Sequence, residues 1–473
     1  MPDFSIIVQS PQVRAIVQQN ALERAFHDAL FPRMLYRGEA TPQPCPAGIG
    51  DTFVFTAPGL IIPDMTPLVP GHDPDVATYQ VEQWTAQLQK YGKAIDTDMP
   101  TSMVAIANMF LRNSHQLGLH AAQTMNRKVR DVMYNAALSG WTVADTGPQT
   151  GTSLRVKRLN GFTRNRSAAG SVVRFDPVSP TNKLAIHYYD NGGGGDTAVN
   201  VIGYVADTAG DEVGPGVLLL DSAMTSTLDR AYVVSNDRAP LVRVDGGMSV
   251  DDLYTGSSIP TLADIRTAVA YVFDNNVPAH PDGRYHMHLD AVSQSKIFSD
   301  YEFTRLMTAL PDYYAERQFA LGELLGCVFF RNSESPTAST VVGGLTATYD
   351  SRDPFAGELW TGGDPSKIDI GKGSRVHRML LTGQGAIMEY YSDLENLLTE
   401  AGITGKVAEP KITNNGIEVF VDRIQLIIRA PLNIHQDIVT TSWKFIGDWP
   451  ARTDAAVGGP ERYKRLVAIE HCE

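Results

Sequence analysis

The sequence of 473 residues lacks the features of several common protein classes. Its three cysteines, Cys45, Cys327 and Cys472, are far apart and form no Cys-x-x-Cys pair, which excludes a zinc knuckle and a disulfide framework. No apolar run approaches the ~18 residues that span a bilayer. The N-terminus lacks the basic and apolar regions of a secretory signal. We therefore expect neither membrane insertion nor secretion by a cleaved signal.

Positive charge is also scarce. The chain has 40 Lys and Arg against 53 Asp and Glu, which gives a net charge of −13 and a pI of about 5.3. A protein that wraps nucleic acid tightly usually has a basic balance, so dedicated DNA or RNA binding is disfavoured. The apolar content of 43% and the charged content of 20% are ordinary for a globular protein. The length suits two to four compact units.

Recognisable catalytic motifs are missing as well. The chain contains no Gly-x-Ser-x-Gly elbow and no His-Glu-x-x-His motif, so these hydrolase classes have no support. The sharpest remaining candidate is His286-Met287-His288, with His280 and Asp290 nearby. Alternate residues of a strand share a face, so His286 and His288 can reach one metal ion. Two histidines rarely complete a site, and a structural pair is the other interpretation.

The clearest predicted element is a very long helix over residues 102–139. This stretch has no proline and a single glycine, Gly118, and its apolar residues recur at steps of three, four or seven. At 1.5 Å per residue it would measure roughly 57 Å. A helix of that length has to run along a flat or elongated body.

A long hairpin is predicted before this helix. Residues 51–56 alternate as a strand, prolines follow at positions 58, 63, 67, 70 and 74, and residues 78–91 are again β-prone. The loop either folds back on its own domain or docks on a neighbouring subunit. Its candidate contact residues are Leu60, Ile61, Ile62, Met65, Leu68 and Val69, together with Trp84 in the second strand.

The N-terminal segment predicts a helix over residues 12–31, between Pro11 and Pro32. Its region holds four arginines that are either solvated or in contact with a polyanion: Arg14, Arg24, Arg33 and Arg37. After the hairpin, Lys90 and Lys93 are either surface residues or candidates for an isopeptide link to a neighbour.

The remainder combines a β-rich and a mixed part. Residues 159–245 read as short strands with glycine-rich turns, which indicates an inserted all-β unit. Beyond it we expect helices at 260–275 and 292–310, strands at 285–290 and 324–331, and a strand or helix at 378–391. Long strands over 411–429 and 432–445 could pack on the long helix. The predicted class is α+β.

This order of elements, together with the segment Tyr91–Gly140, resembles the major capsid proteins of tailed bacteriophages. The resemblance implies the Hong Kong 97-type fold. It implies an N-terminal arm (1–48), an extended E-loop hairpin (49–98), a peripheral domain (99–158 and 405–473) with its spine helix (102–139), a β-rich insertion domain (159–255) and an axial domain (256–404).

The resemblance also implies a function without catalysis or cofactor. Such proteins assemble into hexamers and pentamers that form an icosahedral shell around double-stranded DNA. The implied partners are other copies of the chain, a portal, and scaffolding or cement proteins. Packaged DNA would be contacted weakly, through Arg14, Arg24, Arg33 and Arg37. The implied location is the virion, after assembly in the host cytoplasm.

Three other interpretations remain from the sequence. An encapsulin-like shell protein would share the fold. A metal-dependent hydrolase would use His286 and His288. A tail-tube or decoration protein is disfavoured because such proteins are rich in β-structure and seldom need a 38-residue helix.

Overall fold

The structure is a computed structural model of the chain, and its residues fall into two compact units. Unit 1 comprises Met1–Val54, Thr85–Arg130 and Ile387–Pro450, and unit 2 comprises Phe55–Trp84, Asp131–Ala386 and Ala451–Glu473. The residues that the structure describes are 21–30, 35–45, 52–59, 61, 65, 67, 71, 73, 76–98, 106–144, 149–189, 197–225, 232–246, 259–308, 320–332, 376–392, 411–413, 416–421, 423–429, 438–457 and 461–472.

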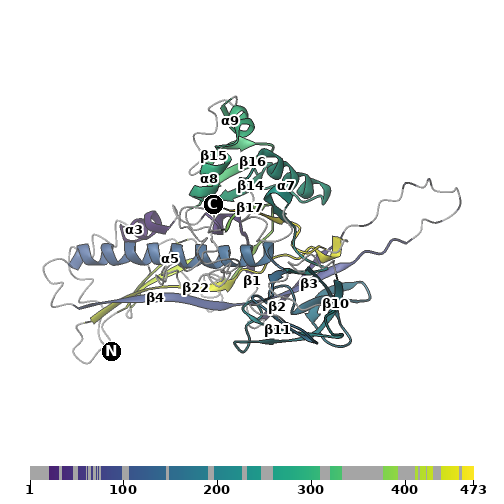
Figure 1. Cartoon of the computed structure of the whole chain (residues 1–473). Helices are drawn as coiled ribbons and strands as arrows, with labels where there is room; N and C mark the ends of the chain where they lie inside the picture. The colour runs from purple at the N-terminus through teal and green to yellow at the C-terminus, as the bar shows by residue number, and fades with distance from the viewer. Residues whose placement is uncertain are drawn as a thin grey trace. The chain divides into compact units, whose positions relative to one another are not determined.

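Unit 1 contains a seven-stranded sheet and the greater part of the longest helix (Figure 1). The sheet has the order β1-β18-β22-β21-β20-β19, with β4 also paired to β22. Its strands are β1 (Thr41–Cys45), β4 (Gln89–Asp98), β18 (Met388–Ser392), β19 (Lys411–Thr413), β20 (Gly416–Val421), β21 (Ile424–Arg429) and β22 (Ile438–Asp448). Burial alternates along β22, as expected for a strand with one face on a core.

Helix α5 (Ile106–Ala137) confirms the predicted long helix, and residues 102–105 of the prediction lie outside the described residues. Its apolar stripe is buried, including Met125 and Val129. The helix packs on the long strands: the Trp443 indole of β22 donates to His120 Nδ1 at 3.3 Å, and Asn113 donates to Thr97 of β4 at 2.6 Å. The chain then turns at Gly140, whose φ is +81°.

A short helix, α3 (Ala21–Leu30), packs against α5 at Gly118. A Cβ at Gly118 would lie 2.7 Å from the carbonyl oxygen of Phe26, so glycine permits this close approach. The helix predicted over 12–31 is confirmed for 21–30, and residues 12–20 lie outside the described residues. A 3-10 turn, η2 (Arg37–Glu39), follows.

Unit 2 contains a mixed sheet covered by helices, in the order β13-β23-β17-β14-β16-β15. Its elements are β13 (Leu241–Arg243), η3 (Val244–Gly246), α7 (Leu262–Asp274), β14 (Tyr285–Leu289), α8 (Ala291–Ile297), α9 (Tyr301–Thr308), β15 (Ala320–Leu324), β16 (Cys327–Arg331), β17 (Val376–Thr382), η6 (Ala455–Val457) and β23 (Leu466–Cys472). Met287 and Ile265 lie in the same buried apolar core, where α7 covers the sheet.

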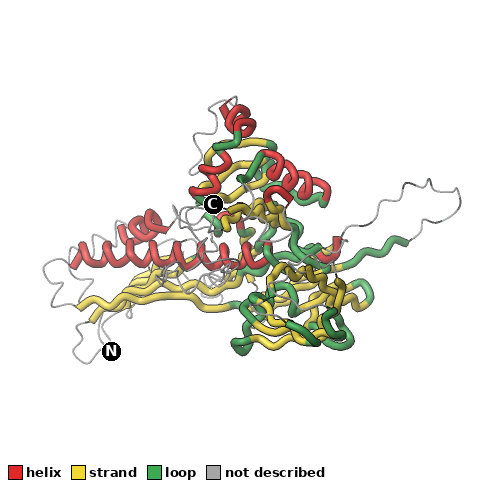
Figure 2. Tube along the Cα trace, in the orientation of Figure 1, coloured by secondary structure: helices red, strands yellow, loops and turns green. Residues whose placement is uncertain are grey.

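The second part of unit 2 is all-β, which confirms the strands expected between 159 and 245; Figure 2 shows it as strands and loops. A six-stranded sheet has the order β5-β12-β9-β10-β11-β6, and a four-stranded sheet the order β2-β3-β8-β7. Residues 52–54 of β2 and 85–87 of β3 are assigned to unit 1. The strands are β2 (Thr52–Pro58), β3 (Val81–Gln87), β5 (Trp141–Val143), β6 (Ser153–Val156), β7 (Arg164–Ala169), β8 (Val172–Pro177), β9 (Leu184–Tyr189), β10 (Thr197–Ala206), β11 (Gly216–Leu220) and β12 (Tyr232–Ser235).

Two predicted elements are wrong in detail. The single helix expected over 292–310 is two helices, because α8 ends at Ile297 and the Asp300 carboxylate accepts hydrogen bonds from the backbone of Glu302 and Leu262. The single strand expected over 324–331 is the end of β15 followed by β16. The turn between them uses Leu325 and Gly326, which both have positive φ. Residues 376–382 and 388–392 are strands.

The end of the chain is divided between the two units, because residues 451–473 belong to unit 2. Strand β23 pairs with β17 over seven positions and with β13. It is buried along Leu466–His471, which suits a central strand rather than a half-exposed one. In the β-rich part, strand β5 begins at Trp141.

Candidate assembly surfaces

The loop between β2 and β3 exposes apolar side chains. Ile61 is 54% exposed, Met65 94% and Val76 92%. Leu60, Ile62, Leu68 and Val69, which share the prediction, lie outside the described residues. Residues 55–84 contain four acidic residues and no Lys or Arg. The described part of the loop therefore offers exposed apolar side chains, and the sequence of residues 55–84 carries no positive charge.

The base of this hairpin is fixed to unit 2. Gly59 N donates to Gln80 O at 2.8 Å, which closes the loop, and Val81 N donates to Ser171 O at 2.7 Å. The Glu82 carboxylate is buried and accepts hydrogen bonds from the backbone and the hydroxyl of Thr453. Burial raises the pKa of Glu82. The loop thus leaves an anchored base.

Trp84 is part of this anchored base. Its ring stacks on Phe55 at 6.3 Å between centroids, and the Arg452 guanidinium lies 6.0 Å from the ring. Trp84 is half-buried. Its contacts are those of a packing residue within unit 2, so it differs from Ile61 and Met65, which project into solvent.

The structure describes two of the four N-terminal arginines, and these two differ in exposure. Arg24 on α3 is exposed, whereas Arg14 and Arg33 lie outside the described residues. Arg37 is 4% exposed, and it donates to both Glu389 oxygens, at 3.0 and 2.7 Å. Arg37 is therefore not placed to contact DNA. Its partner is 352 residues away in the sequence, so no local pattern could reveal the pair.

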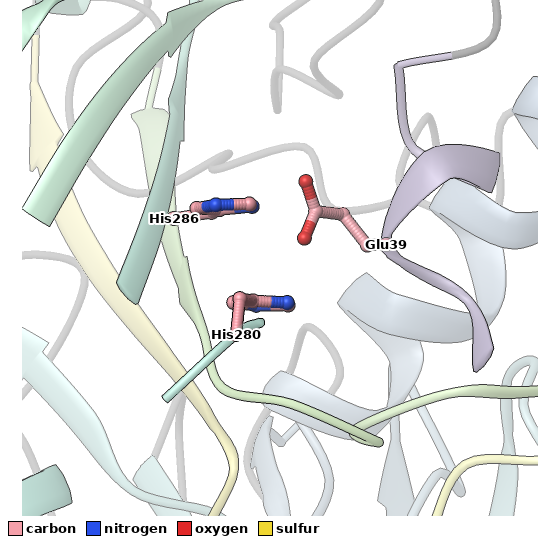
Figure 3. A group of neighbouring side chains, drawn as sticks. All are labelled: Glu39, His280 and His286. Carbon is pink, nitrogen blue, oxygen red and sulfur yellow. The ribbon is translucent and has the colours of Figure 1, made fainter. Parts of the chain in front are cut away.

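His286 and His288 lie on the same strand beside Phe330, as the alternation predicted. His286 Nε2 lies 3.0 Å from Asp282 Oδ2. The rings of His286 and His280 are stacked (Figure 3), with 4.0 Å between their centroids. His288 is buried and stacks on Phe330. Glu39, also drawn in Figure 3, belongs to unit 1.

Asp290, which lies near the two histidines in the sequence, caps a helix and pairs with another histidine. Its Oδ1 caps α8 by accepting from Ser293 N at 2.7 Å, and its Oδ2 pairs with His377 Nδ1. Burial by itself raises the pKa of Asp290. The hydrogen bond and charge of His377 and the hydrogen bonds from Ser293 outweigh burial and bring this pKa down to about 2. These contacts fit the structural interpretation of the histidines.

Sequence reasoning missed two features of the charged residues. In unit 2, Glu470 accepts from Arg243 Nε at 2.9 Å and from Arg378 Nε at 2.8 Å, and all three side chains are buried. In unit 1, strand β4 lies at an exposed margin of its sheet, where Lys90 and Lys93 are both exposed. In the sequence, two lysines precede two aspartates along residues 90–98, but this order of charges does not by itself identify an edge strand.

Comparisons with known proteins give structural likeness without sequence likeness. No family model matches the chain, and no curated protein matches it. The capsid of Ralstonia phage GP4 is similar with a TM-score of 0.48 and 8% identity, over 94% of this chain and 92% of that chain. The cyanophage Pam1 capsid has a TM-score of 0.45 and 8% identity, over 92% and 89%. The acidic stable capsid of Helicobacter pylori bacteriophage KHP30 has a TM-score of 0.45 and 8% identity, over 94% of this chain and 90% of that chain.

Among the described residues, no helix is both long and apolar enough to cross a membrane.

Proposed function

We propose that this chain is a structural subunit of a self-assembling protein shell. More specifically, it is the major capsid protein of a tailed bacteriophage with the Hong Kong 97-type fold. Copies would form hexamers and pentamers, and these would close into an icosahedral shell around double-stranded DNA.

The observation that carries the proposal is the loop between β2 and β3. Its described apolar residues Ile61, Met65 and Val76 are mostly exposed. Covering an exposed apolar side chain of this size yields roughly 1.5–3 kcal/mol. A long loop with several such side chains on an anchored base is therefore suited to docking on a neighbouring copy.

The other elements supply what a thin shell wall needs. Helix α5 has 32 residues, which corresponds to a bar of roughly 48 Å. In unit 1 it lies on long strands, and β22 pairs with β4 over ten positions. Such a layer of helix on sheet is stiff along its length.

In this proposal residues 1–48 form the N-terminal arm, 49–98 the E-loop, 99–158 and 405–473 the peripheral domain, 159–255 the insertion domain and 256–404 the axial domain. The subunit is not an enzyme and needs no cofactor. Its location is the virion, after assembly in the host cytoplasm, and its further partners are a portal, scaffolding or cement proteins and packaged DNA. The exposed Arg24 remains a candidate for DNA contact.

The proposal is tested by expressing the chain alone and with candidate scaffolding proteins, followed by electron microscopy of the soluble fraction. Closed shells, tubes or ring-shaped capsomers are expected. A monodisperse monomer under all of these conditions would contradict the proposal. Stoichiometric metal that is lost in His286→Ala would instead support the hydrolase interpretation.

A deletion pair isolates the role of the loop. Removing residues 58–74 is expected to abolish closed particles while the body still folds. The deletion removes the bond from Gly59 to Gln80, but the contacts of Val81 with Ser171 and of Glu82 with Thr453 remain. The control removes residues 190–196, a glycine-rich stretch of the sequence between β9 and β10. Normal particles without residues 58–74 would refute the docking role of the loop.

A further inference from the structure

Strand β4 presents a long open edge. All ten of its residues pair with β22, from Ile438↔Asp98 to Gly447↔Gln89, without a shift in register. Among the strands that the structure describes, no other strand pairs with β4. In an antiparallel strand about half of the backbone N–H and C=O groups point to each side. The open side of β4 therefore carries a row of hydrogen-bonding groups.

The features that usually block such an edge are few in β4. The strand contains no proline, its register has no bulge, and with ten residues it is long. Figure 1 shows it as an extended arrow along the margin of the unit 1 sheet. Gln89, Lys90, Gly92, Lys93, Ala94 and Asp96 are all exposed. Within β4 itself, the two lysines are the blocking device that edge strands commonly use.

The charges along β4 are polarised in a way that suits pairing with itself. Lys90 and Lys93 lie in the first half of the strand, and Asp96 and Asp98 lie in the second half. In an antiparallel pair of two identical strands, each basic half lies opposite the acidic half of the other copy. Opposite charges across a strand pair are stabilising, and like charges are destabilising.

We propose that β4 of one copy pairs antiparallel with β4 of a second copy, so that two seven-stranded sheets join across a two-fold axis. A register centred on Ala94 places Lys90 opposite Asp98 of the second copy, and the small residues Gly92 and Ala94 leave the centre of the pair unobstructed. An interface of this kind is self-complementary, as two-fold symmetry requires. Backbone hydrogen bonds would provide the attachment and the charges would set the direction.

This inference rests on the proposed shell function, because it names one contact between the copies that would form the shell. It differs from the contact of the loop at residues 58–74, which involves another part of the chain. The two contacts can therefore fail separately.

The test is a pair of cysteine variants in assembled particles. Ala94→Cys is expected to form a disulfide between the two copies of position 94 on oxidation, because facing residues of an antiparallel pair lie within the ~7 Å Cα separation that a disulfide allows. Ser442→Cys is the matched control, since Ser442 is paired with Ala94 one strand further inside the sheet. Two copies of position 442 would be about 14 Å apart at strand spacings near 4.8 Å.

We expect at least tenfold more linked dimer from Ala94→Cys than from Ser442→Cys, on a non-reducing gel with the linked peptide identified by mass spectrometry. A short bismaleimide extends the test to a register shifted by one or two residues. Particles that form normally with no excess link by either reagent would overturn the inference and leave the shell function intact. If the chain forms no particles, the shell proposal fails. The cysteine variants are then tested in concentrated solution, and absence of the link there overturns the inference as well.

A charge exchange in the Ala94→Cys background distinguishes pairing from chance proximity. Lys90→Glu with Lys93→Glu, or Asp96→Lys with Asp98→Lys, makes both halves carry the same sign, and each double variant is expected to reduce the link at position 94 at least tenfold. Combining all four substitutions restores opposite halves, and at least half of the link should return. Thr440 donates to Asp96 at 2.7 Å within one copy, and the fourfold variant cannot restore that bond. A fourfold variant that links no better than the double variants would contradict the proposed pairing.

Discussion

The two units differ in how they carry charge. Unit 1 contains 15 Lys and Arg against 16 Asp and Glu, whereas unit 2 contains 25 against 37. Almost the whole net charge of −13 therefore belongs to unit 2. Charge of one sign keeps surfaces apart, while a balanced surface permits approach. The balance of unit 1 is what a surface needs when copies must meet closely.

The units also differ in how their sheets end. The two six-stranded sheets of unit 2 end in strands of three to five residues: β5, β6, β13 and β15. Short edges offer little to another chain. The unit 1 sheet has β4, an edge of ten residues. The four-stranded sheet ends in β2 and β7, which have seven and six residues, so the ten-residue edge of β4 is longer than each of these edges.

The largest expected effect concerns the buried charges of unit 2. Glu470→Ala leaves Arg243 and Arg378 buried without their shared carboxylate, and we expect it to lower the free energy of unfolding by about 3–5 kcal/mol. The control is Glu212→Ala, which removes a partly exposed pair with Arg164 and should cost less than about 1 kcal/mol. Hydrogen exchange read separately for the two units should show faster exchange first in unit 2. Equal losses in the two variants would contradict this assignment.

Acid should weaken unit 2 through Asp290. Its folded-state pKa, about 2, lies below the ordinary value of 3.8, so its contribution is complete above pH 3.8 and is lost as pH falls toward 2. Because one pKa unit is worth about 1.4 kcal/mol, the contribution is roughly 2 kcal/mol for this buried carboxyl, which is 8% exposed. Denaturant titrations between pH 5 and pH 2 measure it. In Asp290→Asn this part of the pH dependence should disappear, and an unchanged slope would refute the role of Asp290.

Within unit 1, the contact between α3 and α5 should be sensitive to volume. Gly118→Val places a side chain where a Cβ already lies 2.7 Å from Phe26 O and 2.9 Å from Ala29 Cβ. We expect this substitution to lower the free energy of unfolding by about 1–3 kcal/mol and to make amide hydrogen exchange in α3 faster. Gly38→Ala is the control, because a Cβ there meets no atom within 4 Å. A stable Gly118→Val variant with normal α3 protection would show that the two helices can separate without cost.

The local patterns of the sequence predicted elements well and long-range partners poorly. Steps of three and four in residues 106–137 were enough to predict α5, and alternation with glycine turns predicted the strands of the β-rich part. The break between α8 and α9 was not predicted, because it depends on hydrogen bonds that Asp300 accepts from Glu302 and from the distant Leu262. Composition does not reveal such a bond.

The candidate surfaces also show that local features could be predicted and long-range partners could not. The apolar loop residues Ile61 and Met65 could be selected from the sequence, because prolines around them excluded a regular sheet. Arg37 could not be placed, since its burial depends on Glu389 from the other end of the chain. The open edge of β4 could not be predicted either, since a strand is an edge only when its neighbours in the sheet are known.

The smallest effect on stability should come with the largest effect on assembly. Met65→Ser and Val76→Ser change side chains that are more than nine-tenths exposed, so the free energy of unfolding should stay within about 0.5 kcal/mol. If the loop docks on a neighbouring copy, the same double variant removes apolar area from that contact, and closed particles should become rare. Val205→Ser, at a position on β10 that is 56% exposed, provides a comparison on another surface. Light scattering and electron microscopy at equal protein concentration measure the difference. Particle yields that match the wild type would place the loop outside the assembly contacts, and the exposed apolar residues would then need another explanation.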